Sequence, residues 1–219
     1  MPTIAITGAG SGLGEALSYQ YAKHGYKVYL LGRNDNKLQL VKNNIRKNGG
    51  QSEIILCDVS EPASVSIAFQ QIDQLDVFIN NAGIGIFGPI ENYRTEEMEV
   101  LLDTNVKGTI LAVQSALPII QENNGRILNI ISTAGLRGKV NESIYCASKF
   151  AVRGFTESLQ KELENQPVTI TAVYMGGMNT PFWNQSTHVA DPTKLKGPEL
   201  VAEQIFQEDD GRKEIFVDK

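Results

Sequence analysis

The chain has 219 residues, of which 42% are hydrophobic and 21% are charged, and its formal net charge at pH 7 is −5. This length and composition are typical of one globular domain with a substantial core. The acidic balance argues against a nucleic-acid or anionic-membrane surface, because either partner would need a concentrated basic face.

The sequence carries no sign of membrane insertion, export or metal binding. No stretch approaches about 18 uninterrupted apolar residues, and no basic segment followed by an apolar one opens the chain. Cys57 and Cys146 are far apart and lack metal-ligand spacing, and His24 and His188 are isolated. We therefore expect a cytoplasmic protein with reduced thiols and no metal site.

Short strand patterns alternate with longer helical patterns almost from end to end. In the first helical pattern, Leu13, Ala16, Leu17 and Tyr21 recur at helical spacing. The fourth contains Gly108 and Pro118, where we expect a bend or break. In chain order the predicted elements are a strand at 3–7, a helix at 12–25, a strand at 27–32, a helix at 34–50, a strand at 52–59, a helix at 61–72, a strand at 75–83, a helix at 95–121, a strand at 125–132, a helix at 143–164 and strands at 167–175 and 214–219.

The predicted strands are near-continuous runs of Ile, Val and Leu rather than alternating patterns, which indicates strands covered on both faces. Their alternation with helices predicts an α/β protein, a Rossmann-type, doubly wound parallel sheet of about seven strands with helices on both faces. We find no internal repeat, low-complexity tract or linker. We therefore expect residues 1–219 to form one domain that carries both a cofactor site and a substrate site.

A glycine-rich run, "TGAGSGLG", follows the first predicted strand directly. In a doubly wound sheet, ligands bind outside the carboxyl ends of the strands, often after the first one. Glycines there allow positive φ and close backbone approach, and the following helix offers free N–H groups to a diphosphate. A tight strand-to-helix turn without a ligand is the alternative.

The spacing of these glycines differs from the common G-x-G-x-x-G fingerprint. Counted from Gly8, the last glycine position of that fingerprint falls on Leu13. The pattern that fits is T-G-x-x-x-G-x-G, with Thr7, Gly8, Gly12 and Gly14. On this count Gly10 is an optional member of the turn.

A second constellation lies in "YCASK", where Tyr145 and Lys149 are four residues apart and therefore share one helix face. A nearby ammonium favours the phenolate and brings a tyrosine pKa toward the range useful for acid–base catalysis. Ser132 ends the strand pattern "RILNIIS", so its hydroxyl is expected at the ligand edge of the sheet, where it can donate to a carbonyl oxygen. The alternatives are a chance Tyr–Lys pair on a solvated helix and a serine that caps a turn.

With these motifs together the chain resembles the short-chain dehydrogenases/reductases of the core, non-extended branch, over nearly its whole length. The landmarks appear in family order as "TGAGSGLG", "CDV", "NNAG", "DTNVKG", Ser132 and "YCASK". The resemblance implies an NAD(P)-dependent oxidoreductase that acts on a carbonyl group or a secondary alcohol. The glycine spacing and the absence of a large C-terminal substrate region argue against a sugar-nucleotide epimerase. A non-catalytic, cofactor-sensing protein on the same fold is the remaining alternative.

The resemblance also implies roles for the matching residues. Tyr145 is the expected general acid or base, Lys149 holds the nicotinamide ribose and tunes Tyr145, and Ser132 orients the carbonyl. Asn105 is expected to hold a water of the proton relay, the alternative being a helix-interior residue satisfied locally. The other residues expected to bind the cofactor are Thr7, Gly8, Ser11, Gly12, Leu13, Gly14, Arg33, Asp58, Val59, Asn81, Ala82, Gly83, Gly176 and Thr180, besides Tyr145 and Lys149. Met175 stands where the family usually has proline, so we expect a less rigid loop there.

NADP(H) is the expected cofactor, with NAD(H) as the alternative. An NAD enzyme needs an acid at the end of the second strand, but that position is Gly32, followed by Arg33, which can contact a 2′-phosphate. Asp35 comes too late and suits a helix start better.

The residues expected near the substrate are 84–89, 133–141 and the stretch after Thr180, in which Phe182 and Trp183 either roof an apolar substrate or anchor a short helix. We expect a small carbonyl or alcohol as the partner molecule. The resemblance also implies a homodimer or homotetramer formed through the helices at 95–121 and 143–164.

Overall fold

The computed structural model describes residues 1–184 and 186–217 and contains one seven-stranded sheet. Its strand order is β3-β2-β1-β4-β5-β6-β7, and every neighbouring pair is parallel. The strands are β1 (Thr3–Thr7), β2 (Lys27–Gly32), β3 (Gln51–Leu56), β4 (Val77–Asn80), β5 (Arg126–Ile130), β6 (Thr169–Tyr174) and β7 (Glu214–Phe216). The predicted doubly wound sheet is confirmed. Its order reverses between β1 and β4, which are neighbours.

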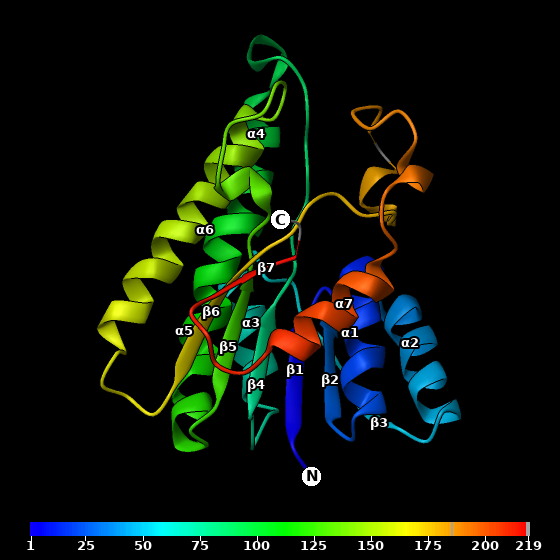
Figure 1. Cartoon of the computed structure of the whole chain (residues 1–219), viewed down its shortest axis with the longest axis vertical. Helices are drawn as coiled ribbons and strands as arrows, with labels where there is room; N and C mark the ends of the chain where they lie inside the picture. The colour runs from blue at the N-terminus through cyan, green and yellow to red at the C-terminus, as the bar shows by residue number, and fades with distance from the viewer. Residues whose placement is uncertain (185, 218–219) are drawn as a thin grey trace.

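Helices cover both faces of the sheet (Figure 1). On one face lie α1 (Gly12–Lys23), α2 (Asp35–Lys47) and α7 (Pro198–Glu208). The other face carries α3 (Pro62–Phe69), α5 (Gly108–Glu122) and α6 (Ser143–Glu162), and α4 (Thr95–Leu102) extends this layer beyond the carboxyl ends of the strands. Among the described residues no helix is both long enough and apolar enough to cross a bilayer.

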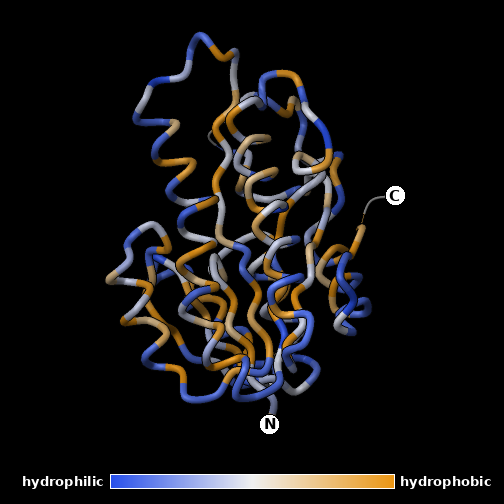
Figure 2. The backbone as a smooth tube through the Cα atoms, turned by 90° about the vertical axis from the view of Figure 1, so that its left-hand side faces the viewer, coloured by the Kyte–Doolittle hydropathy of each residue, from blue (hydrophilic) through white to orange (hydrophobic). Residues whose placement is uncertain are grey.

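The strands read as continuous apolar runs because successive side chains enter two different cores. Ile4 and Ile6 of β1 pack against α1, whereas Ala5 between them packs on the opposite face with Phe78 of β4. The same alternation runs through the neighbouring strands. Hydrophobic backbone segments are accordingly concentrated along the strands in the interior (Figure 2).

The helix predicted at 95–121 is interrupted once. After α4, a π-helical segment at Asp103–Lys107 leads into α5 at Gly108, where a Cβ atom would lie 2.9 Å from the Val59 side chain. The break expected at Pro118 is wrong, because α5 continues through it to Glu122. Pro118 and Gln114 are both exposed, so the carbonyl that loses its helical partner faces solvent.

The predicted elements missed one helix, α7, which begins in the last three residues of the stretch at 181–200 interpreted as a substrate loop. It begins with Pro198 at its first position and buries Val201, Ala202 and Ile205 beside α1. The last five strands end earlier than predicted. Of the strand predicted at 214–219, the structure confirms 214–216, and residues 218 and 219 lie outside the described part of the chain.

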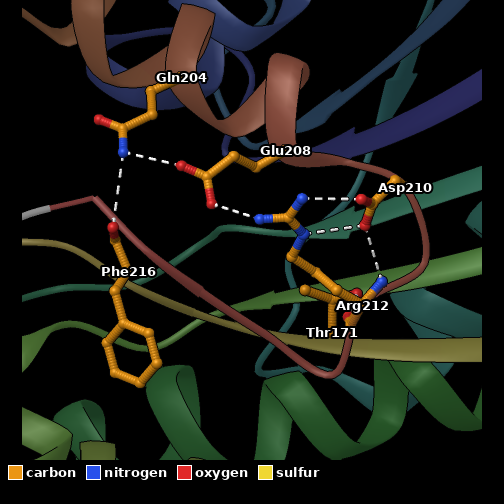
Figure 3. A network of polar contacts seen from close by, with 6 residues as sticks. All are labelled: Thr171, Gln204, Glu208, Asp210, Arg212 and Phe216. Carbon is orange, nitrogen blue, oxygen red and sulfur yellow. Dashed lines mark hydrogen bonds and ion pairs between the residues drawn. The ribbon is translucent and has the colours of Figure 1, made fainter.

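A buried ion pair ties the end of α7 to the sheet and to α1. Asp209, whose side chain is 1% exposed, accepts two hydrogen bonds from Arg126 of β5, at 2.6 Å from Nε and 2.8 Å from Nη2. The Tyr21 hydroxyl of α1 donates to the same carboxylate at 2.6 Å. The next carboxylate, Asp210, instead belongs to a surface network in which Arg212 also binds Glu208 (Figure 3).

We expect Asp209→Ala to lower the free energy of unfolding by about 3 kcal/mol, because it leaves the Arg126 guanidinium without its buried partner. Asp210→Ala, which removes an exposed pair, is the matched control and should cost less than about 1 kcal/mol. Urea denaturation of both variants measures the difference. Equal losses would show that the buried pair does not stabilise the fold as described.

Candidate active site

A cavity of about 560 Å³ lies at the carboxyl ends of the strands, where the sheet order reverses. Its size and place are those of a small-molecule site in a doubly wound sheet. Most of the residues expected to bind a cofactor or substrate line it together. These are Gly8, Ser11, Gly12, Leu13, Arg33, Asp58, Val59, Asn81, Ala82, Gly83, Ser132, Tyr145, Lys149, Gly176 and Thr180.

The glycine turn after β1 is shaped for close approach. Gly8 and Gly12 have φ of 67° and 57°, values that residues with a Cβ adopt rarely. A Cβ on Gly14 would overlap the Gly8 carbonyl, and one on Gly12 would lie 3.2 Å from Thr180. Ser11 is the N-cap of α1, and no capping hydrogen bond to its hydroxyl occurs in the described structure. The turn therefore leaves the first N–H groups of α1 available to an anion.

Thr7 and Gly14 position this turn without lining the cavity. The Thr7 hydroxyl accepts hydrogen bonds from the backbone of Asn81 at 2.9 Å and Ala82 at 3.0 Å. The Asn81 side chain in turn donates to the Thr7 carbonyl at 2.9 Å. These bonds lock the end of β1 to the segment that follows β4. Thr7 and Gly14, both expected to bind the cofactor, thus lie behind the turn and have a structural role in it.

Ser132, Tyr145 and Lys149 come together on the opposite wall of the cavity. Ser132 lies two residues beyond β5, not at its end, and has φ 109° and ψ 154°. Such a backbone is strained for a serine, and strain of this kind concentrates at functional sites. The Ser132 hydroxyl also accepts a bond from Ala134 N at 3.2 Å, so the serine caps a short helix and faces the cavity at once.

Burial dominates the acid–base properties of this group. It raises the pKa of Tyr145 well above 10, while hydrogen bonding with Ser132 lowers it and the charge of Glu142 raises it further. Lys149 lies 5.9 Å from the centre of the Tyr145 ring and donates to the Ile130 carbonyl at 3.0 Å. Burial lowers the pKa of Lys149 to about 8. The expected lowering of the tyrosine pKa by Lys149 is therefore not seen, and Tyr145 is protonated at neutral pH.

Asn105 lies behind the cavity wall and binds the segment that forms it. It lies in the π-helical segment, where its side chain accepts a bond from Ile84 N at 2.8 Å and donates to Ile84 O at 2.9 Å. A further bond, at 3.1 Å, goes to the Ser148 hydroxyl of α6. Asn105 thus fixes the segment after β4 against the helix of Tyr145 and does not itself line the cavity.

The end of the cavity beside β2 is rich in cations. Arg33 is largely exposed and lies 3.7 Å from Asp58, a loose pair that leaves its guanidinium free to reorient. Lys37, in the first turn of α2, lines the same space. Asp35 is the first residue of α2 and does not line the cavity. This agrees with its spacing, which favoured a helix start over a cofactor contact. Sequence reasoning missed Lys37, although its place one turn after the Asn34 cap gave a signal.

The other end of the cavity has an aromatic wall. Phe182 and Trp183 lie on a short 3-10 helix and line the space beside Ile84, so both face the cavity. Phe87 packs against both of them, with ring centroids at 6.0 Å and 5.4 Å. Sequence reasoning missed Glu142, one helical turn before Tyr145, and described His188 as isolated. The structure pairs His188 with Glu142 at 2.9 Å.

The loop that contains Met175 is held by a backbone hydrogen bond. The Met175 carbonyl accepts a hydrogen bond from Thr133 N at 2.9 Å, which ties the segment after β6 to the segment after Ser132. Its side chain packs against the core. The bond between the two segments supplies a constraint where the family's proline would have fixed φ.

Comparison with known proteins agrees with this geometry. The family model described as short chain dehydrogenase matches residues 2–190. An uncharacterized oxidoreductase of Staphylococcus aureus is 35% identical over 206 residues, which cover 92% of this chain and 87% of that protein. The chain therefore belongs to the short-chain dehydrogenase family.

Two solved structures show which ligands such folds carry. A short-chain dehydrogenase/reductase from Burkholderia phymatum in complex with NAD has a TM-score of 0.88 and 25% identity, covering 98% of this chain and 88% of that one. A metagenomic short-chain oxidoreductase in complex with NADP has a TM-score of 0.84 and 26% identity, covering 99% and 96%. The two structural relatives thus hold different nicotinamide cofactors.

We expect Lys149→Met to stabilise the ligand-free protein at pH 7 by about 1–3 kcal/mol, because it removes a buried charge. Between pH 8 and 10.5 the unfolded chain binds more protons at Lys149 than the folded chain does. The stability of the parent protein therefore rises with pH through this window, and the advantage of the variant should shrink.

Urea unfolding at pH 7 and pH 9.5 measures this change, with Lys161→Met at the exposed end of the same helix as the control. A Lys149→Met variant less stable than the parent at pH 7 would contradict the account.

Proposed function

We propose that the protein is an NADP(H)-dependent oxidoreductase that interconverts a carbonyl compound and its alcohol. The observation that carries the proposal is the meeting of Ser132, Tyr145 and Lys149 in one cavity with the glycine turn after β1. A nicotinamide cofactor bound there supplies a hydride to the carbonyl carbon, or accepts one from the alcohol.

The residues present fit such a cofactor. The glycine turn leaves no room for side chains against Gly8, and α1 offers its free N–H groups to a diphosphate. Val59 and Asp58 line the space beside β2, as an adenine pocket requires. Thr180 lies near Gly12 on the other side, and Gly176 lines the same cavity. Lys149, on the wall that carries Ser132 and Tyr145, would hold the nicotinamide ribose.

In the reductive direction, Tyr145 donates its phenolic proton to the carbonyl oxygen as negative charge develops there. Burial keeps this proton on Tyr145 at neutral pH but makes the phenol a weaker acid, so the transfer relies on the charge that develops on the carbonyl oxygen. The Ser132 hydroxyl donates to the same oxygen and stabilises its charge. A proton from solvent then restores the phenol, beside the Lys149 side chain.

NADP(H) is the proposed cofactor because of the charges beside β2. Arg33 and Lys37 line this end, and Gly32 leaves the position of an NAD-type carboxylate empty of any side chain. The one acid, Asp58, is engaged by both the backbone N–H and the hydroxyl of Ser60. A 2′-phosphate would therefore meet two cations and no free carboxylate.

We also propose that the chain self-associates in the cytoplasm. Val100, Ile110 and Phe150 expose apolar side chains on α4, α5 and α6, the layer through which the resemblance expects a second copy to bind. Both cysteines are free and buried, which suits a reducing compartment.

Tyr145→Phe should lower kcat/KM for carbonyl reduction by about 10²–10⁴-fold, because the ring remains but the proton donor is gone. The dissociation constant of NADPH should stay within about twofold, since packing in the cavity is preserved. Steady-state kinetics on a carbonyl panel, with NADPH binding measured separately, checks both values. Tyr26→Phe, far from the cavity, serves as the control. Full activity in Tyr145→Phe would remove the proposed mechanism.

Arg33→Ala should weaken NADPH binding about 10- to 100-fold and leave NADH binding nearly unchanged, because only NADPH carries the 2′-phosphate. Arg46→Ala, at the exposed far end of α2, should change neither. Titrations with both nucleotides decide the matter. Unchanged NADPH affinity in Arg33→Ala, or equal efficiency with both nucleotides in the parent, would speak for an NAD enzyme.

A further inference from the structure

Glu142 is a buried carboxylate that the proposed mechanism does not use. It lies at the N-cap of α6, three residues before Tyr145, and its side chain is 9% exposed. It lines the cavity together with Ser132 and Tyr145. A buried carboxylate needs hydrogen-bond partners to balance its lost hydration, so its partners indicate its role.

Only one of its two oxygens is well paired. Oε1 lies 2.9 Å from His188 Nε2, whereas Oε2 has only Lys139 Nζ, at 4.0 Å, which is beyond hydrogen-bond distance. Within residues 1–184 and 186–217, no donor lies within hydrogen-bond distance of Oε2. Oε2 is not sealed from solvent, so Glu142 offers the cavity an acceptor that the described residues leave without a hydrogen bond.

His188 fixes the carboxylate from outside the cavity. Its ring stacks on Phe87 with a centroid separation of 4.6 Å and an interplanar angle of 17°. Phe87 also packs edge to face against Tyr145, at 5.3 Å. This arrangement holds the carboxylate in one position, and a preorganised acceptor discriminates ligands better than a mobile one.

Apart from Lys139, which also lines the cavity, the wall near Glu142 includes several apolar side chains. Ile84, Phe182 and Trp183 form the nearby wall, so a substrate body there is hydrophobic. A site that offers one fixed acceptor on an apolar wall rejects ligands that lack a matching donor, because the acceptor then stays unpaired.

We propose that Glu142 is a specificity-determining residue, which accepts a hydrogen bond from a hydroxyl or ammonium group that the substrate carries apart from its carbonyl. The substrate class is therefore an apolar or aromatic carbonyl compound with a separate hydrogen-bond donor. This inference rests on the proposed carbonyl chemistry of the same cavity.

The test uses matched benzaldehydes that carry a hydroxymethyl, a dimethylaminomethyl or an ethyl group at the 3- or 4-position. The first offers a hydroxyl, the second an ammonium N–H, and the third no donor. In the parent protein, kcat/KM for the preferred donor compound should exceed that of its ethyl counterpart roughly 10- to 100-fold. Which donor is preferred tells whether the substrate group is neutral or charged.

Glu142→Gln keeps the size of the side chain and removes its charge. This variant should lower the donor-to-ethyl ratio at least fivefold. The ratio is the readout because the charge of Glu142 also acts on Tyr145 and can change the turnover of all three compounds together. Glu162→Gln, exposed on the same helix, is the control and should leave every ratio unchanged.

A second readout does not depend on turnover. Trp183 is the only tryptophan of the chain and lines the cavity, so its fluorescence reports binding of the corresponding benzyl alcohols to the nucleotide-free protein. In the parent, the alcohol with the preferred donor should have a lower dissociation constant than the ethyl compound. In Glu142→Gln this difference should disappear.

Two results would overturn the proposal. One is equal binding and turnover of all three compounds by the parent. The other is an equal loss for all three in Glu142→Gln, which would mean that Glu142 only anchors His188. If no compound is reduced but the order of binding persists, the proposed function fails and the role of Glu142 stands.

Discussion

The hydrogen bonds between Thr7 and the segment after β4 are the constraint on which the site depends. Thr7 ends β1, and Asn81 follows β4, so these bonds span the two strands between which the sheet order reverses. They leave Gly8 in a left-handed backbone and bring Gly14 against its carbonyl. The cavity opens directly above them. A sheet of this topology creates the crevice, and the Thr7 bonds give it a fixed floor.

The opposite wall is built at a cost to stability. Ser132 holds a strained backbone, and Lys149 is buried with a lowered pKa. Neither feature helps the chain to fold. Destabilising features that gather within one cavity indicate a site selected for its chemistry rather than for stability. The scaffold around the site is stabilised by the buried Arg126–Asp209 pair and by two apolar cores.

The sequence predicted the sheet and the catalytic group well because both depend on local patterns. Apolar runs mark buried strands, and Tyr145 and Lys149 share a helix face whatever surrounds them. Positions that depend on packing between distant segments were not predictable. His188 meets Glu142 because the loop after Thr180 reaches the N-cap of α6. Pro118 lies within α5 on a face that is exposed. The pKa of Tyr145 depends on its burial, which spacing to Lys149 does not reveal.

Hydride transfer within this cavity is the central claim, and isotope transfer tests it most directly. The protein is incubated with NADPH deuterated at C4, separately on each face of the ring, and with a benzaldehyde. The alcohol produced is then examined by mass spectrometry. The account expects deuterium on the carbinol carbon from one of the two labelled forms and none from the other. Nucleotide binding without deuterium in the alcohol from either form would contradict it.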